Sequence, residues 1–438
     1  MKKLELFKNI LLLGTGPTTL QLGLNFKKAL NSKVGIAGRP SIRSEKFFSS
    51  LVKHGHLVEV SIQNRKHEKM QGHFTVDDVF FKYEEVIGTW DTLVLAVTTD
   101  AYLEVLKALP KSILQGVQRV ILISPTLGSN YLVHHYVKQF NPQVEVMSFS
   151  TYYGDTRWLS SEPSNQVLTT AIKKKIYIGS TQFPSDAVEK LVNLYKDLGL
   201  TFEIMKTPIE AETRNISLYV HPPLFMNEFS LRYIFEEEKH QKYVYKIYPE
   251  GPITPLLMKN MLNQWKEIMK VLSQLNVKQM NLLKFMTEDN YPVRRESLSL
   301  KDIENFNELK SIHQQYLLYV RYASLLVDPF SEPDEKGRYF DFSAVPIQTV
   351  FMNKEKEMDI PRMPKEDYYR LKMIQSIARY LESDCPTIDH FLNAYEDKVK
   401  AFSEVNKEKK LSSAFSNLAF EEDIKMIYEE LDKSVIKQ

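Results

Sequence analysis

The stretch that most constrains this chain lies near its start, where an uncharged apolar run leads into a turn with two glycines. Residues 9–13 form the apolar run, Gly14 and Gly16 stand in the turn, and apolar side chains at helical spacing follow over 20–30. This order predicts a strand, a tight turn and a helix. Gly14 permits the sharp turn, and Gly16 lets a pyrophosphate approach the backbone and the free N–H groups at the start of the helix. The stretch therefore predicts the first βα unit of a Rossmann-type dinucleotide-binding domain.

Two features limit what the turn alone can show. The third position of the glycine fingerprint is Thr19, where Gly or Ala is usual, and this predicts looser packing of the helix on the strand. A turn with two glycines also joins strands and helices that bind no nucleotide, so a purely structural role stays open. For a bound dinucleotide we expect the pyrophosphate to lie against Gly14, Thr15, Gly16 and Pro17.

The residues after the second predicted strand, 33–37, indicate which dinucleotide binds. An NAD enzyme places an acidic residue about here for the ribose 2′-hydroxyl, whereas this chain has Arg39. A carboxylate would repel a 2′-phosphate, and a guanidinium can bind one with two hydrogen bonds. Ser41, Arg43 and Lys46 follow in the same loop. We therefore predict NADPH (NADP) as the cofactor, with a solvated basic loop as the alternative interpretation.

Length and composition narrow the remaining classes. A chain of 438 residues suits two domains, and 43% hydrophobic residues, 26% charged residues and a net charge of +2 are typical of a soluble globular protein without a nucleic-acid footprint. The single cysteine, Cys385, allows no intrachain disulfide and no cysteine-based zinc cluster. No apolar run approaches roughly 18 residues and no signal cleavage site follows the N-terminus, so we expect a cytoplasmic protein that does not bind membranes.

Strand and helix patterns alternate through the first part of the chain and predict a mostly parallel sheet. Strands are expected at 57–62, 92–97, 120–124, 144–149 and 201–205, helices at 101–109, 129–139 and 186–198, and a hairpin at 167–181 around Lys173 and Lys174. Long periodic patterns at 256–275, 311–327 and 368–381 predict helices in the second part. We therefore expect an NADP-binding domain over 1–207 and a mainly α-helical substrate and dimerisation domain over 208–438, with a peripheral tail beyond Asn406.

Ligands of such sheets bind beyond the carboxyl ends of the strands, so the segments that leave those ends are the ones to search. Pro125 and Thr126 follow one such strand and are expected at the cofactor. Asp155 and Arg157 follow another, and Arg214 lies near the predicted domain junction. A guanidinium suits a substrate carboxylate and Asp155 suits a substrate amine. Ion pairs between domains for the two arginines, and a turn-capping role for Asp155, are the alternatives.

His221 is the candidate for proton transfer. It precedes two prolines at the end of a helical pattern, and histidine can donate or accept a proton near neutral pH, as hydride transfer to a C=N or C=O group requires. A lone histidine is more often structural, and that alternative stays open. His134 and His135 are adjacent, so on a helix they would point in different directions and make a poor metal clamp. We predict no metal site.

Several long segments resemble the opine metallophore dehydrogenases, the staphylopine dehydrogenase family, over nearly the whole chain. The segments that carry the resemblance are 13–17, 121–126, 149–157, 211–215, 219–227, 249–254 and 339–346. The resemblance implies reductive condensation of an α-keto acid, pyruvate or 2-oxoglutarate, with a histidine-derived aminobutyrate amine, to give a nicotianamine-like opine that chelates metals. It also implies a homodimer, an arginine and a lysine on the 2′-phosphate, and His221 as the proton donor, for which Asp341 is one conceivable carboxylate partner.

Two other functions fit the same architecture. An NADPH-dependent keto-acid or hydroxy-acid reductase would need no amine. A non-catalytic NADPH-binding module would bind the cofactor at Gly14 and Arg39 while His221 stayed inert. Oxidation of NADPH with different substrate mixtures distinguishes the three.

Overall fold

The computed structural model describes residues 6–236, 240–288, 297–324, 342–416 and 420–435. Its contacts divide the chain into two compact units, one formed by Met1–Arg214 with Glu422–Gln438 and the other by Asn215–Glu421. The chain first passes from one unit to the other between Arg214 and Asn215. The return of the C-terminal segment to the first unit was not expected from the sequence.

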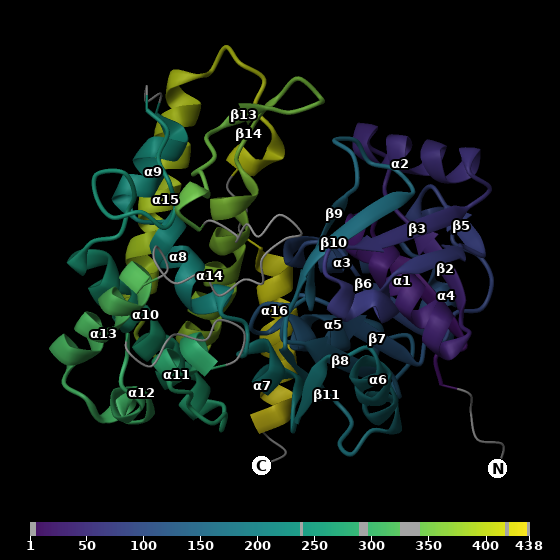
Figure 1. The fold of residues 1–438 in the computed structure, drawn as a ribbon, viewed down its shortest axis with the longest axis horizontal. Helices are drawn as coiled ribbons and strands as arrows, with labels where there is room; N and C mark the ends of the chain where they lie inside the picture. The colour runs from purple at the N-terminus through teal and green to yellow at the C-terminus, as the bar shows by residue number, and fades with distance from the viewer. Residues whose placement is uncertain (1–5, 237–239, 289–296, 325–341, 417–419, 436–438) are drawn as a thin grey trace. The chain divides into compact units, whose positions relative to one another are not determined.

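The first unit is organised around an eight-stranded sheet (Figure 1). Its strand order is β12-β11-β8-β7-β6-β1-β2-β5. Every neighbouring pair is parallel except β11 and β8, which run antiparallel. The strands are β1 (Asn9–Leu13), β2 (Lys33–Ala37), β5 (Asp78–Phe80), β6 (Thr92–Leu95), β7 (Arg119–Leu122), β8 (Glu145–Phe149), β11 (Lys175–Ser180) and β12 (Thr201–Met205). The expected mostly parallel sheet is confirmed.

Both faces of this sheet are buried, because alternate residues of a strand point to opposite sides. In β1, Ile10 and Leu12 pack in one apolar cluster with α1, α2 and α6, and Leu11 and Leu13 pack in another with α3, α4 and α5. The helices of this unit are α1 (Pro17–Leu30), α2 (Ile42–Lys53), α3 (Tyr102–Ala108), α4 (Lys111–Gly116), α5 (Ser129–Val137), α6 (Asp186–Asp197), α7 (Pro208–Glu212) and α16 (Glu421–Val435). This is the Rossmann-type arrangement that the sequence predicts.

A second, four-stranded sheet in the order β4-β3-β10-β9 corrects one prediction. Its strands are β3 (Leu57–Ile62), β4 (Gly72–Thr75), β9 (Gly154–Trp158) and β10 (Gln166–Ile172). The hairpin expected at 167–181 is wrong, because β10 pairs with β3 and β9 whereas β11 joins the large sheet. The burial of the two strands explains the difference. Inner and outer residues alternate along β10, which suits a sheet with one covered face, whereas nearly all of β11 is buried.

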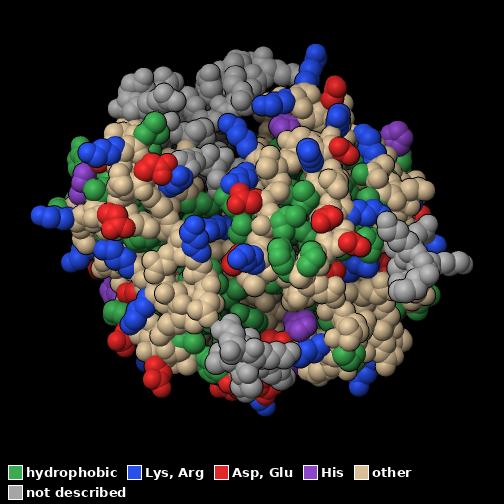
Figure 2. All heavy atoms as spheres, turned by 90° about the horizontal axis from the view of Figure 1, so that it is seen from below, with side chains coloured by type: hydrophobic (Ala, Val, Ile, Leu, Met, Phe, Trp, Pro, Cys, Tyr) green, Lys and Arg blue, Asp and Glu red, His purple; other side chains and the backbone are tan. Residues whose placement is uncertain are grey.

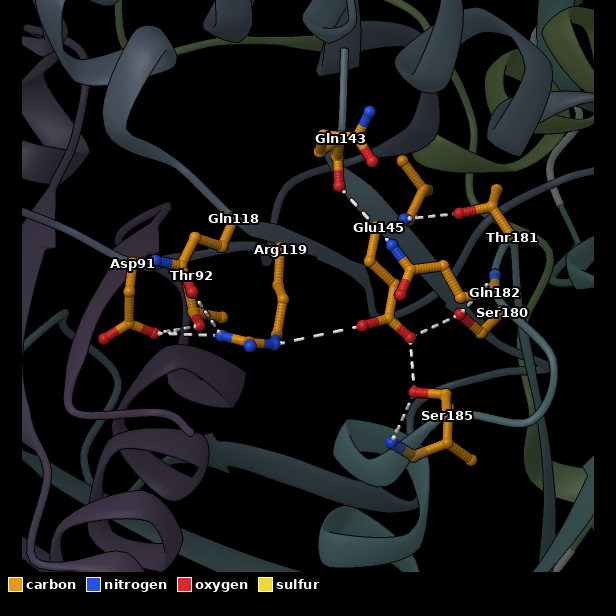
Figure 3. A network of polar contacts seen from close by, with 12 residues as sticks. Asp91, Thr92, Gln118, Arg119, Gln143, Glu145, Ser180, Thr181, Gln182 and Ser185 are labelled. Carbon is orange, nitrogen blue, oxygen red and sulfur yellow. Dashed lines mark hydrogen bonds and ion pairs between the residues drawn. The ribbon is translucent and has the colours of Figure 1, made fainter. Parts of the chain in front are cut away.

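A buried polar network ties together the amino ends of the central strands (Figure 3). The Arg119 guanidinium lies between two carboxylates, 3.7 Å from Asp91 and 3.8 Å from Glu145. Asp91 also accepts a hydrogen bond from the backbone N–H of Asn9 at 2.6 Å, and Glu145 accepts one from the Ser180 hydroxyl at 2.6 Å. Both carboxylates thus have partners despite their burial. The network lies at the edge opposite to the one where ligands bind in such sheets.

The second unit is mainly helical, as expected. Its helices are α8 (Ser217–Phe225), α9 (Glu228–Phe235), α10 (Pro255–Gln274), α11 (Leu282–Glu288), α12 (Leu300–Glu304), α13 (Ser311–Ser324), α14 (Arg362–Tyr380) and α15 (Pro386–Val405), with a two-stranded ribbon of β13 (Phe351–Met352) and β14 (Met358–Asp359). Among the described residues, no helix is both long enough and apolar enough to span a membrane. The face drawn in Figure 2 mixes basic and acidic side chains, in keeping with the small net charge of +2.

The C-terminal helix α16 belongs to the first unit and is not a peripheral tail. Its Leu431 is fully buried. Its Glu430 accepts hydrogen bonds from His134 of α5, at 2.7 Å, and from Lys138, the residue that follows α5. Burial opposes ionisation of Glu430, but these two partners outweigh it and lower its pKa to about 2. His135 also lies 3.5 Å from Glu430, so both adjacent histidines serve this helix contact.

Candidate active site

The glycine turn after β1 has the geometry that a pyrophosphate needs. Gly14 has φ +130°, and a Cβ there would lie 2.6 Å from the Ala96 carbonyl oxygen, so the position requires glycine. Gly16 caps α1, and a Cβ there would meet nothing within 4 Å, which leaves its outer side open. α1 begins at Pro17, has no acidic residue in its first turn, and so presents a positive dipole end with free N–H groups. Thr15 and Pro17, which flank Gly16, are part-buried.

The loop after β2 lies beside this turn and presents basic side chains. A Cβ on Gly38 would clash with the Thr15 side chain, which shows how closely the two loops approach. Ser44 donates a hydrogen bond to the Arg39 carbonyl oxygen at 2.6 Å, and Ser41 caps α2 by accepting one from the Ser44 N–H at 3.1 Å. The Arg39 backbone is therefore held in place, while its side chain is exposed.

The charged side chains of this loop differ in their pairing. Lys46 is bound to Glu162 at 2.8 Å, so its charge is already paired. Arg39 and Arg43 form no ion pair with a described residue, and both are exposed. The residues present fit a 2′-phosphate, with Arg39 and Arg43 as its charged partners. For Lys46 the same role would require release from Glu162.

Two further predicted cofactor residues lie at the same edge of the sheet. Pro125 and Thr126 follow β7 and are buried. The Thr126 N–H donates to the Ser129 hydroxyl at 3.0 Å, and the Thr99 hydroxyl, from the loop after β6, donates to the Ser124 carbonyl oxygen at 3.1 Å. The Thr126 hydroxyl is buried and has no hydrogen-bond partner among the described residues. The loops after β1, β2, β6 and β7 thus form one continuous edge.

Glu212, at the end of α7, fixes part of this edge and has no recognisable signal in the sequence. It is fully buried, and its carboxylate accepts hydrogen bonds from the Gly128 N–H at 2.9 Å, the Asn130 N–H at 2.8 Å and the Ser148 hydroxyl at 2.9 Å. Burial raises the pKa of Glu212 to about 7, and these hydrogen bonds oppose the rise. Its partners are more than sixty residues away along the chain, so neither periodicity nor a local motif reveals them.

Asp155 and Arg157 lie on the exposed side of β9. They alternate with Thr156, whose hydroxyl lies 2.7 Å from that of Thr169 on β10. Asp155 accepts a hydrogen bond from the Thr170 hydroxyl at 2.8 Å. The two predicted substrate residues are therefore neighbours on one open surface of β9.

Arg214 lies at the other end of the central sheet. Its guanidinium stacks 5.8 Å from the centre of the Tyr177 ring on β11, and its Nε is buried without a hydrogen-bond partner among the described residues. The Tyr177 carbonyl oxygen accepts a hydrogen bond, at 2.8 Å, from the N–H of Ser150, the residue that follows β8. Arg214 is thus near the carboxyl end of β8.

His221 lies within helix α8 and not at its end. The helix continues through Pro222 and Pro223 as far as Phe225, so the end expected at the prolines is wrong. Proline at 222 removes the N–H that would bond to the carbonyl oxygen of Leu218. The side-chain amide of Gln264 on α10 donates to that oxygen instead, at 2.9 Å. A donor from another helix therefore allows the helix to continue past the prolines.

Asp367, on α14, faces His221. Its Oδ1 lies 3.9 Å from His221 Nδ1, an ion-pair distance, and the Met363 sulfur lies 3.2 Å from the same nitrogen. Asp367 is fully buried and pairs with Arg370 one helical turn on. Burial raises the pKa of Asp367 to about 7, and the Arg370 charge opposes this rise. Asp341, the partner suggested from sequence, lies outside the described residues.

The sequence contains no clear signal for Asp367. Together with Arg370 it forms an i, i+3 pair, a pattern usually found on solvated helix faces. No group of three or more His, Cys, Asp or Glu side chains within the described part of the chain is arranged to hold a metal ion.

The model of the family described as "Staphylopine dehydrogenase" matches residues 8–431. The chain is 45% identical to a staphylopine synthase of Staphylococcus aureus over 94% of this chain and 96% of that protein, and 36% identical to a pseudopaline synthase of Pseudomonas aeruginosa over 91% of each. It also resembles the structure of a yersinopine dehydrogenase with NADP+ bound, at 28% identity and a TM-score of 0.88, over 97% of this chain and 99% of that one. The chain therefore belongs to the staphylopine dehydrogenase family.

Proposed function

We propose that this protein is an NADPH-dependent opine dehydrogenase that joins an α-keto acid, pyruvate or 2-oxoglutarate, to the primary amine of a histidine-derived aminobutyrate. The product is a nicotianamine-like opine that chelates transition metals, so the metal belongs to the product and not to the enzyme. Membership of a dehydrogenase family supports an oxidoreductase, and the NADP+ bound by the yersinopine dehydrogenase supports the cofactor. The two exposed arginines after β2 support a 2′-phosphate independently of that relative.

The arrangement of His221, Asp367 and Arg370 is the observation on which the chemistry rests. NADPH, when bound, supplies a hydride to the carbon of the imine that the two substrates form. The imine nitrogen then needs a proton, and His221 holds one at its imidazole. Asp367, 3.9 Å away, stabilises the protonated ring, and Arg370 favours the ionised form of Asp367. The buried carboxylate also limits the orientations that the ring can adopt.

The remaining predicted residues act in binding. Arg214, whose Nε has no hydrogen-bond partner in the described ranges, is suited to a substrate carboxylate. Asp155 and Arg157 would contact the amine-bearing substrate from the open surface of β9. Glu212 holds the start of α5 and thereby the loop that carries Thr126. A homodimer formed through the helical unit is part of the proposal.

The test is NADPH oxidation followed at the nicotinamide absorbance, with the amine and each keto acid supplied alone and together. Oxidation only with both supports an opine dehydrogenase and identifies the keto acid. Oxidation with keto acid alone would assign a simple reductase, and tight NADPH binding without oxidation would assign a non-catalytic module.

A further inference from the structure

Lys173 is a part-buried cation that has no counter-ion within the described part of the chain. It lies in the short connection between β10 and β11, and its ammonium donates one hydrogen bond, to the Thr151 hydroxyl at 3.3 Å. No carboxylate among the described residues forms an ion pair with it, whereas nearby Lys175 is paired with Glu203 at 2.5 Å. Burial lowers the pKa of Lys173 to about 8. Neither the predicted cofactor site nor the His221 group uses this residue.

Lys173 lies at the carboxyl edge of the large sheet, beside the end of β8. Because β11 runs antiparallel to β8, the start of β11 lies where β8 ends. The Lys173 N–H also donates to the Tyr153 carbonyl oxygen at 2.8 Å, which ties the connection to the segment that leaves β8. Lys173 precedes β11, and the order β11-β8-β7-β6-β1 separates it from the glycine turn by about 19 Å, four strand spacings. Lys173 lies still farther from the Arg39 loop, so a 2′-phosphate bound by that loop does not reach Lys173.

A part-buried ammonium whose hydrogen-bond partner among the described residues is one neutral hydroxyl is unfavourable unless an anion compensates it. The substrates of the proposed reaction carry carboxylates, and a charge-assisted hydrogen bond to a carboxylate would supply that compensation. We propose that Lys173 binds a substrate carboxylate at the carboxyl end of β8, with Thr151 orienting the ammonium. This inference rests on the proposed function for the identity of the anion.

The test compares Lys173→Met with Lys174→Met. The first substitution removes the part-buried charge and keeps a side chain of similar length, and the second removes the charge of the exposed neighbour. The KM for keto acid and the KM for amine are measured separately, so that the carboxylate can be assigned to one substrate. We expect Lys173→Met to raise one of these KM values about 10- to 100-fold. We expect Lys174→Met to change both by less than about twofold, with the KM for NADPH and the melting temperature retained in both variants.

Unchanged KM values in Lys173→Met would overturn the inference. A fall in melting temperature with an equal rise in all three KM values would also overturn it, because that pattern indicates a structural role. A second measurement does not depend on turnover. It follows the rise in melting temperature that the keto acid or the amine causes in the wild type with NADP+ present. Loss of that rise in Lys173→Met supports the inference. An equal rise in melting temperature in the variant, or no rise in the wild type, contradicts the inference. This measurement needs no turnover, so it also applies where the NADPH oxidation assay has already excluded an opine dehydrogenase.

Discussion

Replacing Asp367 with asparagine isolates the charge that faces His221. Two unit charges 3.9 Å apart, as His221 and Asp367 are, interact by about 4 kcal/mol at an effective dielectric constant near 20. The His221 side chain is 26% exposed, so solvent weakens this attraction. We therefore expect about 1.4–2.8 kcal/mol of lost stabilisation of the protonated ring, which corresponds to a kcat about 10- to 100-fold lower. The KM for NADPH should stay unchanged, because its predicted ligands lie in the first unit.

The assay is steady-state NADPH oxidation with both substrates at pH 8, where Asp367 is ionised, and again at pH 6. The carboxylate of Asp367 carries its charge above its pKa of about 7 and loses the charge as the pH falls through that value. The difference between wild type and Asp367→Asn should therefore shrink at pH 6. Glu366→Gln is the matched control, since Glu366 is the adjacent carboxylate and pairs with Arg362. A kcat for Asp367→Asn within about twofold of wild type at pH 8 would refute the role assigned to the pair.

Three further predictions test the cofactor loop and the framework. Arg39→Ala should raise the KM for NADPH far more than that for NADH, and equal effects would exclude Arg39 as a ligand of the 2′-phosphate. Arg119→Met should destabilise the protein by about 3–5 kcal/mol, measured by thermal unfolding, because the buried Glu145 and the part-buried Asp91 lose their cationic partner; a preserved melting temperature would contradict this. The raised pKa of Glu212 favours its protonated form in the folded state, so its contribution to stability is full below about pH 4.5 and is lost as the pH rises through about 7. Relative to Glu212→Gln, the free energy of unfolding of the wild type should thus fall by on the order of 3 kcal/mol between pH 4 and pH 8. Melting temperatures of the two proteins that change in parallel with pH would contradict this prediction.

Features encoded by neighbouring residues were predictable from the sequence. The strand, glycine turn and helix at the start of the chain depend on local periodicity and on backbone freedom at Gly14, and the structure confirms them. The position of Arg39 after β2 follows in the same way, since β2 pairs in register beside β1. The family resemblance is confirmed by the match over residues 8–431.

Features that depend on distant partners were not predictable. The short link at Lys173 and Lys174 suggests a hairpin, but the choice of sheet for β10 and β11 is made by the surfaces that cover each strand. Helix α8 continues past Pro222 because Gln264 supplies the missing donor, and that residue lies on another helix. Glu212 and Asp367 acquire their roles from buried partners elsewhere in the chain, which a local pattern does not encode.

The central claim is reductive condensation of an amine with a keto acid, and one measurement tests it most directly. Purified protein is mixed with NADPH, the histidine-derived aminobutyrate and either pyruvate or 2-oxoglutarate, and the nicotinamide absorbance is followed while the product mass is determined. We predict NADPH consumption only when amine and keto acid are both present, with one equivalent of the condensed secondary amine formed per NADPH oxidised. NADPH consumption without the amine, or no consumption with any mixture, would contradict the account.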